Sequence, residues 1–222
     1  MFSQLFGSVF AVAMALTGAT AARDPSADFA GRHPSRAART IADWVVRAHD
    51  NGRSSFFIVD KPSARLYVFD PRGQLRGSAP VLLGLARGDD SAPGIADKPL
   101  AQIRRDERTT PAGRFVAERG RNLHGDDVVW VDYAAAISLH RVREVASYEH
   151  RARRLRTPTI ADNRISYGCI NVPVDFYDRV VARAWESGGV IIYVLPDVKP
   201  LSEVLPRRET LLHASSVLRR IG

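Results

Sequence analysis

Short apolar segments separated by turn residues dominate the chain between residues 55 and 195, and they restrict it to a fold made mostly of β-strands. The clearest segments are 55–60 (Ser-Phe-Phe-Ile-Val-Asp), 65–70 (Arg-Leu-Tyr-Val-Phe-Asp) and 190–195 (Val-Ile-Ile-Tyr-Val-Leu). Further strands are predicted for 77–85, for the stretch after the turn at 109–113, and for 128–133 and 135–140. We expect roughly eight strands, several joined as antiparallel hairpins, and hence a mainly β domain.

The segments around these strands contain predicted helices and one arginine-rich insertion. A polar linker over 23–39 leads to a short helix that ends near His49 and is capped by Ser35 or Thr40. The other predictions are an exposed loop at 86–108, an arginine-rich insertion with helical stretches at 141–164, an amphipathic helix at 173–185 and a terminal helix at 209–220.

The first 21 residues have the pattern of a secretory signal peptide. Leu5–Leu16 is an apolar run, and Ala19-Thr20-Ala21 fits the small-x-small cleavage pattern. The run is shorter than the about 20 apolar residues that a membrane-spanning helix needs. We therefore expect export to the periplasm or cell envelope, with no membrane span in the mature form. An uncleaved anchor is the alternative.

The chain of 222 residues carries a formal net charge of +8, and nearly all its cations are arginines. Such a charge fits attraction to an anionic polymer, such as a cell wall, a membrane surface or nucleic acid. It also fits a coding bias with no functional meaning. Because no aromatic-interleaved basic motif or known DNA-binding pattern is present, nucleic acid is not an expected partner.

The sequence contains one cysteine, Cys169, within Arg-Ile-Ser-Tyr-Gly-Cys-Ile-Asn-Val-Pro. In an exported protein a lone cysteine has no disulfide partner, so a retained thiol is a candidate nucleophile. The preceding Gly168 lets the backbone approach a substrate closely or take a φ that other residues resist. A buried structural cysteine is the competing interpretation.

A nucleophilic thiol needs a base or a nearby cation to remove its proton. Among six histidines, His140 ends the apolar segment 135–140, where a strand leaves the core, and we expect it to be the base. A histidine with a purely structural role is the competing interpretation. A metal site is not expected, because no two histidines have the short spacing of a zinc motif and one cysteine cannot make a structural site.

Acyl transfer also requires hydrogen-bond donors for the developing oxyanion. The backbone N–H groups of Tyr167, Gly168 and Cys169 suit this role if the chain turns there. The hydroxyl of Ser166 or of Ser138 is expected to orient His140, and the spacing does not choose between them.

These residues resemble the catalytic domain of the YkuD-type L,D-transpeptidases. A histidine at the end of an apolar strand, followed later by Ser-x-Gly-Cys-Ile-Asn, is similar to that family's signature. The signature falls on His140, Ser166, Gly168, Cys169 and Asn171. The segment 110–115 (Thr-Pro-Ala-Gly-Arg-Phe) looks like the family's Thr-Pro-x-Gly-x-Phe turn. The chain is thus divided into a signal peptide (1–21), a linker with a short helix (22–53), a catalytic domain (54–196) and a C-terminal extension (197–222).

The resemblance implies a YkuD-like β-sandwich of mixed sheets and an exported enzyme that acts on peptidoglycan stem peptides. Cys169 would form a thioester with a tetrapeptide stem and release D-Ala, with His140 as general base and then acid. The acyl group would pass to a diaminopimelate amine, which gives a 3-3 cross-link, or to another amine or water. The resemblance implies no metal and no organic cofactor.

The chain departs from the family's pattern at two points. Tyr167 stands where the family commonly has a second histidine. The interval of 29 positions from His140 to Cys169 is longer than usual, because of the arginine-rich insertion. We expect Arg154 or Arg164 to bind a substrate carboxylate. The competing interpretation is a solvated helix face on which Glu149 and Arg153 pair.

Three other functions stay open at this stage. The same domain would be a carboxypeptidase or endopeptidase if water were the acceptor. A papain-like hydrolase is less compatible, because there the cysteine precedes the histidine. A non-catalytic wall-binding module would keep the fold, although the presence of both Cys169 and His140 argues against it.

Overall fold

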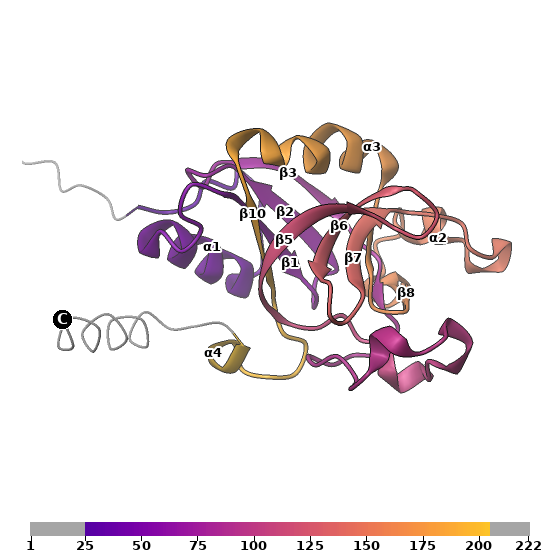
Figure 1. The fold of residues 1–222 in the computed structure, drawn as a ribbon. Coiled ribbons are helices and arrows are strands. Elements are labelled where there is room, and N and C mark those ends of the chain that lie inside the picture. The colour runs from indigo at the N-terminus through magenta and orange to yellow at the C-terminus, as the bar shows by residue number, and fades with distance from the viewer. Residues whose placement is uncertain (1–24, 205–222) are drawn as a thin grey trace, which may run out of the picture.

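The computed structural model describes residues 25–204, and within them the fold is mainly β, as the sequence predicts (Figure 1). The predicted signal peptide and the predicted helix at 209–220 lie outside the described residues. The strands are β1 (Ser55–Asp60), β2 (Arg65–Phe69), β3 (Leu75–Pro80), β4 (Leu83–Gly84), β5 (Gly113–Arg121), β6 (Asp127–Asp132), β7 (Ile137–Arg141), β8 (Arg164–Ser166), β9 (Ile170–Val172) and β10 (Val190–Val194).

Eight of the strands form one mixed sheet in the order β3-β2-β1-β10-β5-β6-β7-β9, and β4 pairs with β8 separately. Within the large sheet, β1 with β10 and β7 with β9 are parallel, and the other neighbours are antiparallel. The sheet curls until its two ends meet. Leu82, just beyond β3, and Asn171 in β9 exchange two backbone hydrogen bonds of 2.9 Å. Through this contact the outer edge of β9 is paired instead of open to solvent.

Alternation along the central strands builds a hydrophobic core on each face of the sheet. In β1, for example, Phe57 and Val59 belong to one core, and Phe56 and Ile58 belong to the other. The first core also takes side chains from β7 and β9, so it lies inside the curled sheet. Because both faces are covered, β1 is buried along its whole length, and its residues from Phe56 to Val59 are all apolar instead of alternating with polar ones.

The helix α1 (Arg36–Ala48) covers the second core with its buried face. Ser35 is its N-cap, since the Ser35 hydroxyl accepts a hydrogen bond of 3.1 Å from the backbone N–H of Ala38. Of the two residues predicted as caps, Ser35 therefore fills the role and Thr40 lies inside the helix. The helix ends at Ala48, and His49 closes it in a left-handed conformation.

The segment before α1 is not the polar linker that the sequence suggests. Phe29 is buried, with its ring edge-on to Tyr67 at 5.4 Å and to Phe69 at 5.0 Å between ring centres. Edge-on aromatic pairs of this kind stabilise a packed core. The backbone of Asp28 also exchanges hydrogen bonds with Gly73 and Leu75, so both packing and backbone contacts fix the linker against the sheet.

The helix predicted for 173–185 is present, but it is irregular. It runs as α3 (Val174–Phe176), a π-helical turn (Tyr177–Val181) and a 3-10 segment (Ala182–Ser187), and it covers the first core. Gly77 in β3 permits its close approach, because a Cβ at that position would meet Phe176 and Val180 at 3.0–3.2 Å.

Three other segments differ from their predictions in detail. The strand predicted for 135–140 starts only at Ile137, because Asp132 accepts a hydrogen bond from the N–H of Ala135 and Ala136 has a φ of +54°. The strand predicted for 77–85 is interrupted between β3 and β4. Short 3-10 turns occupy the loop at 95–97, 100–102 and 105–107, and the insertion holds helical turns at 147–149, α2 (Arg151–Arg154) and 160–163, as predicted.

A buried ionic cluster joins distant parts of the chain. The ammonium group of Lys61, which is fully buried, donates to Asp89 Oδ1 at 2.9 Å and to the carbonyl oxygens of Gly88 and Thr110 at 2.6 and 2.7 Å. Asp89 also accepts hydrogen bonds from the backbone N–H groups of residues 197–199. Residues assigned by sequence to a C-terminal extension thus pack into the same body. No helix within residues 25–204 is long and apolar enough to cross a membrane.

We expect replacement of Asp89 by asparagine to lower the free energy of unfolding by about 3 kcal/mol at neutral pH, because the buried Lys61 charge loses its nearest carboxylate and keeps only Asp197 at 3.6 Å. Burial raises the pKa of the Asp89 carboxyl, but hydrogen bonds from the Lys199 backbone, the Lys61 side chain and neighbouring N–H groups outweigh it and hold the pKa well below its usual range. The folded-state pKa is thus below the unfolded one. The difference in free energy of unfolding between the wild type and the variant is therefore largest above about pH 4, and it decreases as the pH falls further.

Urea unfolding of both proteins at neutral and acidic pH measures this difference. Asp106→Asn is the matched control, because the Asp106 carboxylate pairs with Arg104 on the exposed surface and should leave stability nearly unchanged. Equal stability of the Asp89→Asn variant and the wild type at neutral pH would contradict the assignment.

Candidate active site

Two neighbouring strands bring the predicted reactive residues together. In the parallel pair β7–β9, Leu139 lies opposite Ile170 and His140 lies opposite Asn171. Leu139 and Ile170 are fully buried in the core. Because side chains alternate along a strand, Ser138 and His140 from β7 share the other face with Cys169 and Asn171. All four line one pocket.

This pocket has a volume of about 360 Å³ and is apolar over most of its surface. Its apolar walls are formed by Leu100, Leu123, Trp130, Ala136, Val145 and Tyr167. Two guanidinium groups also reach it, and both are paired within the protein: Arg143 with Asp126 and Arg151 with Glu149, each at 2.6 Å. A pocket with mostly apolar walls and a few polar groups is typical of a ligand-binding site.

Cys169 is half-buried at the base of β9. Its Sγ lies 3.5 Å from Ser138 Oγ and 3.7 Å from the carbonyl oxygen of Ala136. Burial raises the pKa of the thiol, but the hydrogen bond and charge of His140, together with Ser138, outweigh burial and lower the pKa below its ordinary value. An inert structural cysteine in apolar surroundings has a raised pKa, so the environment favours a nucleophile.

The orientation of His140 is set by a backbone carbonyl. Its Nδ1 lies 2.7 Å from the carbonyl oxygen of Arg141, and because a carbonyl only accepts, Nδ1 carries a proton. Its Nε2 lies 3.4 Å from Nδ2 of Asn171. The two serines predicted to orient the ring are engaged elsewhere: Ser138 contacts the thiol, and Ser166 contacts the backbone around Cys169.

The turn that precedes the nucleophile is held from both sides. The Ser166 hydroxyl donates to the carbonyl oxygen of Cys169 at 2.6 Å and accepts from the N–H of Gly168 at 3.1 Å. Thr110, in the Thr-Pro segment, donates its hydroxyl to the Gly168 carbonyl at 2.7 Å. Since the Gly168 N–H is already bonded, the remaining predicted oxyanion donors are the N–H groups of Tyr167 and Cys169.

Gly168 is required at its position for two reasons. Its φ of +136° is a conformation that residues with a Cβ resist. A Cβ there would also meet the carbonyl oxygen of Thr109 and the Cδ1 atom of Ile137, both at 2.7 Å. The neighbouring Tyr167, where the family pattern commonly has histidine, lies with its ring 4.0 Å from the guanidinium of Arg108.

The two arginines predicted to bind substrate are bonded within the protein. Arg154 donates to the carbonyl oxygens of Glu149 and Asp162 at 2.7 and 3.0 Å. Arg164 is buried and forms a bidentate pair with Asp197 at 2.6 and 2.9 Å. Neither lines the Cys169 pocket. The predicted pairing of Glu149 with Arg153 is also replaced, because the Glu149 carboxylate binds Arg151.

Arg151 is the site residue that the sequence does not single out. Its guanidinium lines the Cys169 pocket and donates to Oδ1 of Asn171 at 3.0 Å. In the sequence it is one of several arginines in the insertion, and no spacing rule connects it to a residue 20 positions further on. Only the three-dimensional contact distinguishes it from Arg153, which lies exposed in the same helix α2.

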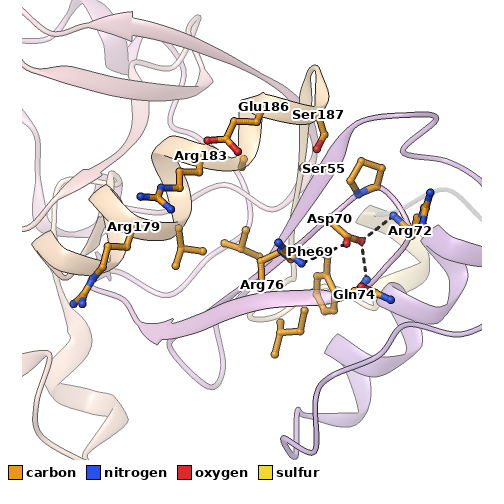
Figure 2. Close-up of a pocket in the computed structure, with 15 residues that line it drawn as sticks. Ser55, Phe69, Asp70, Arg72, Gln74, Arg76, Arg179, Arg183, Glu186 and Ser187 are labelled. Atoms are coloured by element: carbon orange, nitrogen blue, oxygen red, sulfur yellow. Dashed lines mark hydrogen bonds and ion pairs between the residues drawn. The ribbon is translucent and has the colours of Figure 1, made fainter.

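A larger cleft of about 600 Å³ lies elsewhere, between the β2–β3 hairpin and the helical segment 174–187 (Figure 2). Arginines stand on both of its sides: Arg72 and Arg76 on the hairpin, and Arg179 and Arg183 on the helix. It contains neither the cysteine nor any histidine, so the candidate chemistry belongs to the smaller pocket.

Fold and site together define a mainly β protein with a half-buried thiol of lowered pKa beside a histidine. No protein-family model matches this chain, and no curated protein matches it. Its similarities are to solved structures. The cell-shape determining protein Pgp2 from Campylobacter jejuni is 16% identical with a TM-score of 0.43, over 66% of this chain and 49% of that one.

Two L,D-transpeptidases are similar to a comparable extent. The Enterococcus faecium enzyme is 14% identical with a TM-score of 0.35, over 64% of this chain and 50% of that one. The Mycobacterium smegmatis enzyme is 17% identical with a TM-score of 0.35, over 64% and 58%. This chain thus spans about half of these proteins' lengths. At such identities and TM-scores, the function has to be inferred from the site itself.

We expect the Cys169 thiol to react at a lower pH than an ordinary cysteine, whose pKa is about 8.5. The rate of alkylation by iodoacetamide, followed against pH by intact mass, reports on this residue because it is the only cysteine. His140→Gln should raise the midpoint of the profile, because the group that lowers the thiol pKa is lost. His33→Gln, at an exposed position outside the Cys169 pocket, is the control and should leave it unchanged. A wild-type midpoint at the ordinary value would refute the assignment.

Proposed function

We propose that this protein is a cysteine-dependent acyltransferase, an L,D-transpeptidase that acts on peptidoglycan stem peptides through a thioester at Cys169. The proposal is carried by one observation: adjacent parallel strands present Cys169 and His140 on the same face of an apolar pocket, and the pKa of the thiol is lowered there. The resemblance of the surrounding motif to the YkuD family supplies the substrate class.

In the first half-reaction, Sγ of Cys169 attacks the carbonyl carbon of the residue before the terminal D-Ala of a tetrapeptide stem, and His140 Nε2 takes the thiol proton. The N–H groups of Tyr167 and Cys169 are the proposed donors to the oxyanion. Collapse of the tetrahedral intermediate breaks the C–N bond. His140 then returns the proton to the leaving amine, D-Ala departs and a thioester remains.

In the second half-reaction, an amine attacks the thioester, His140 accepts the amine proton, and the thiolate leaves and is reprotonated. A diaminopimelate amine as acceptor gives a 3-3 cross-link. The choice between an amine and water as acceptor is left to the experiment below. Water as acceptor would make the same site an L,D-carboxypeptidase.

The proposed setting is the periplasm or cell envelope, which follows from the signal-peptide pattern and from the cell-wall substrate. It is also consistent with the single unpaired cysteine, which needs no partner for folding. Peptidoglycan is the proposed partner, and neither nucleic acid nor a metal ion takes part in the proposed reaction.

The test is intact-mass spectrometry of the mature protein after incubation with a carbapenem, which acylates activated nucleophiles of this kind. We expect one adduct per wild-type chain and none on Cys169→Ala. Incubation with a disaccharide tetrapeptide should release D-Ala, and His140→Gln should lower the rate by about 10²–10⁴-fold. Dimeric product would identify a transpeptidase, and tripeptide alone a carboxypeptidase. The absence of both adduct and D-Ala release would leave a wall-binding module as the function.

A further inference from the structure

The arginine-rich insertion delivers one buried guanidinium to the back of the active site. Arg151, the first residue of α2, is only 4% exposed. Its Nε donates to Glu149 Oε2 at 2.6 Å and its NH1 to Asn171 Oδ1 at 3.0 Å. The carboxylate of Glu144 fixes the start of this helix by accepting hydrogen bonds from the N–H groups of Arg151 and Ala152. A buried guanidinium with these partners is not free to bind a substrate carboxylate, so its role has to be sought through Asn171.

These contacts determine which way the Asn171 amide faces. A guanidinium only donates hydrogen bonds, so the atom that faces Arg151 is the amide oxygen. The amide nitrogen then lies 3.3 Å from the carbonyl oxygen of Cys169, which only accepts. Both partners impose the same orientation. Consequently the amide NH₂ is the end that faces Nε2 of His140.

The orientation of this amide in turn favours one form of the imidazole. An NH₂ group facing Nε2 is compatible with a lone pair there and is repelled by a proton. On the other side of the ring, the Arg141 carbonyl requires a proton on Nδ1. The neutral form protonated at Nδ1 satisfies both neighbours. Nε2 then carries a lone pair, as a base that takes the proton of the Cys169 thiol requires.

We propose that Arg151 is a positioning residue that, by orienting the Asn171 amide, keeps Nε2 of His140 free of a proton until the thiol is deprotonated. This inference rests on the proposed role of His140 as the base, but it concerns the site and not the substrate. The insertion therefore contributes to the chemistry through the amide of Asn171, without contacting the stem peptide.

Without the guanidinium, the Asn171 amide is free to rotate and to present its oxygen to Nε2. The oxygen stabilises a proton there, and the loss of a neighbouring cation also makes the imidazolium easier to form and the thiolate harder to form. The first effect puts a positive charge beside the thiol and lowers the thiol pKa, whereas the loss of the Arg151 charge raises it. The protonation of the imidazole is therefore the direct readout of the proposal. Arg141 keeps its partners Asp127 and Asp178 in such a variant, and Arg143 keeps Asp126. Glu149 loses its partner, and the double variant Glu149→Gln/Arg151→Met removes the carboxylate charge that is then unpaired.

The experiment is the pH profile of Cys169 alkylation by iodoacetamide in the wild type and in Arg151→Met. We expect the profile of the variant to shift from that of the wild type, because the protonation of the imidazole that sets the thiol pKa changes. Arg153→Met is the matched control, because it makes the same substitution in α2 at an exposed position and should leave the profile unchanged. Since no peptidoglycan is used, the result is independent of whether the proposed transpeptidase reaction takes place.

A second measurement addresses the histidine itself. Long-range ¹H–¹⁵N correlation spectra at neutral pH, with the His140 signals identified by their loss in His140→Gln, should show an unprotonated Nε2 in the wild type. In Arg151→Met they should show protonation at that nitrogen. Arg151→Lys keeps the positive charge but lacks the planar set of N–H donors with which the guanidinium binds both Glu149 and Asn171. It should therefore restore the wild-type pH profile of alkylation only in part.

Two outcomes would overturn the proposal. One is an Arg151→Met profile and His140 spectrum identical to those of Arg153→Met. The other is full restoration by Arg151→Lys, which would mean that charge alone matters and not the orientation of the amide. If Arg151→Met does not fold, the double variant Glu149→Gln/Arg151→Met removes both members of the ion pair, leaves no unpaired buried charge and is measured in the same way.

Discussion

The position of the nucleophile depends on a charge that is buried far from it in the sequence. The Lys61 ammonium binds the carbonyl oxygen of Thr110, and the Thr110 hydroxyl binds the carbonyl oxygen of Gly168, the residue before Cys169. Two bonds of 2.7 Å therefore connect the β1–β2 turn to the catalytic turn. A buried ammonium tolerates few geometries, because each of its protons needs an acceptor. The same rigidity is thereby imposed on the turn that carries the thiol.

Much of the fold follows from local sequence. The apolar runs that predict strands at 55–60 and 190–195 form β1 and β10, and Ser35 caps α1 as its residue type predicts. Where the structure differs from the predicted elements, the cause is a local contact that the sequence pattern does not reveal. One is the hydrogen bond to Asp132 that makes β7 start later than predicted. Another is the burial of Phe29 and the backbone bonding of Asp28, which fix the linker to the core.

The candidate site was predictable only where residue type is decisive. Cys169 and His140 can be selected from the sequence alone, because one is a lone cysteine after a glycine and the other is a histidine at the end of a predicted strand. The contact of Arg151 with Asn171 and the pairing of Arg164 with Asp197 were not predictable, because arginines in a basic insertion look alike until their contacts are known. The choice between a substrate-binding and a structural guanidinium depends on tertiary contacts to Asn171 and Asp197, which no local pattern encodes.

The closure of the sheet through Leu82 and Asn171 has a consequence for how the protein folds. Asn171 joins the two ends of the sheet with its backbone and faces His140 with its side chain. Strand β1 pairs with β10, near the other end of the described chain, and Asp197 must arrive before Arg164 has its partner. Contacts so distant in sequence make folding slow, because long loops have to close. The arrangement of Cys169 and His140 that lowers the thiol pKa therefore depends on pairings that span almost the whole described chain.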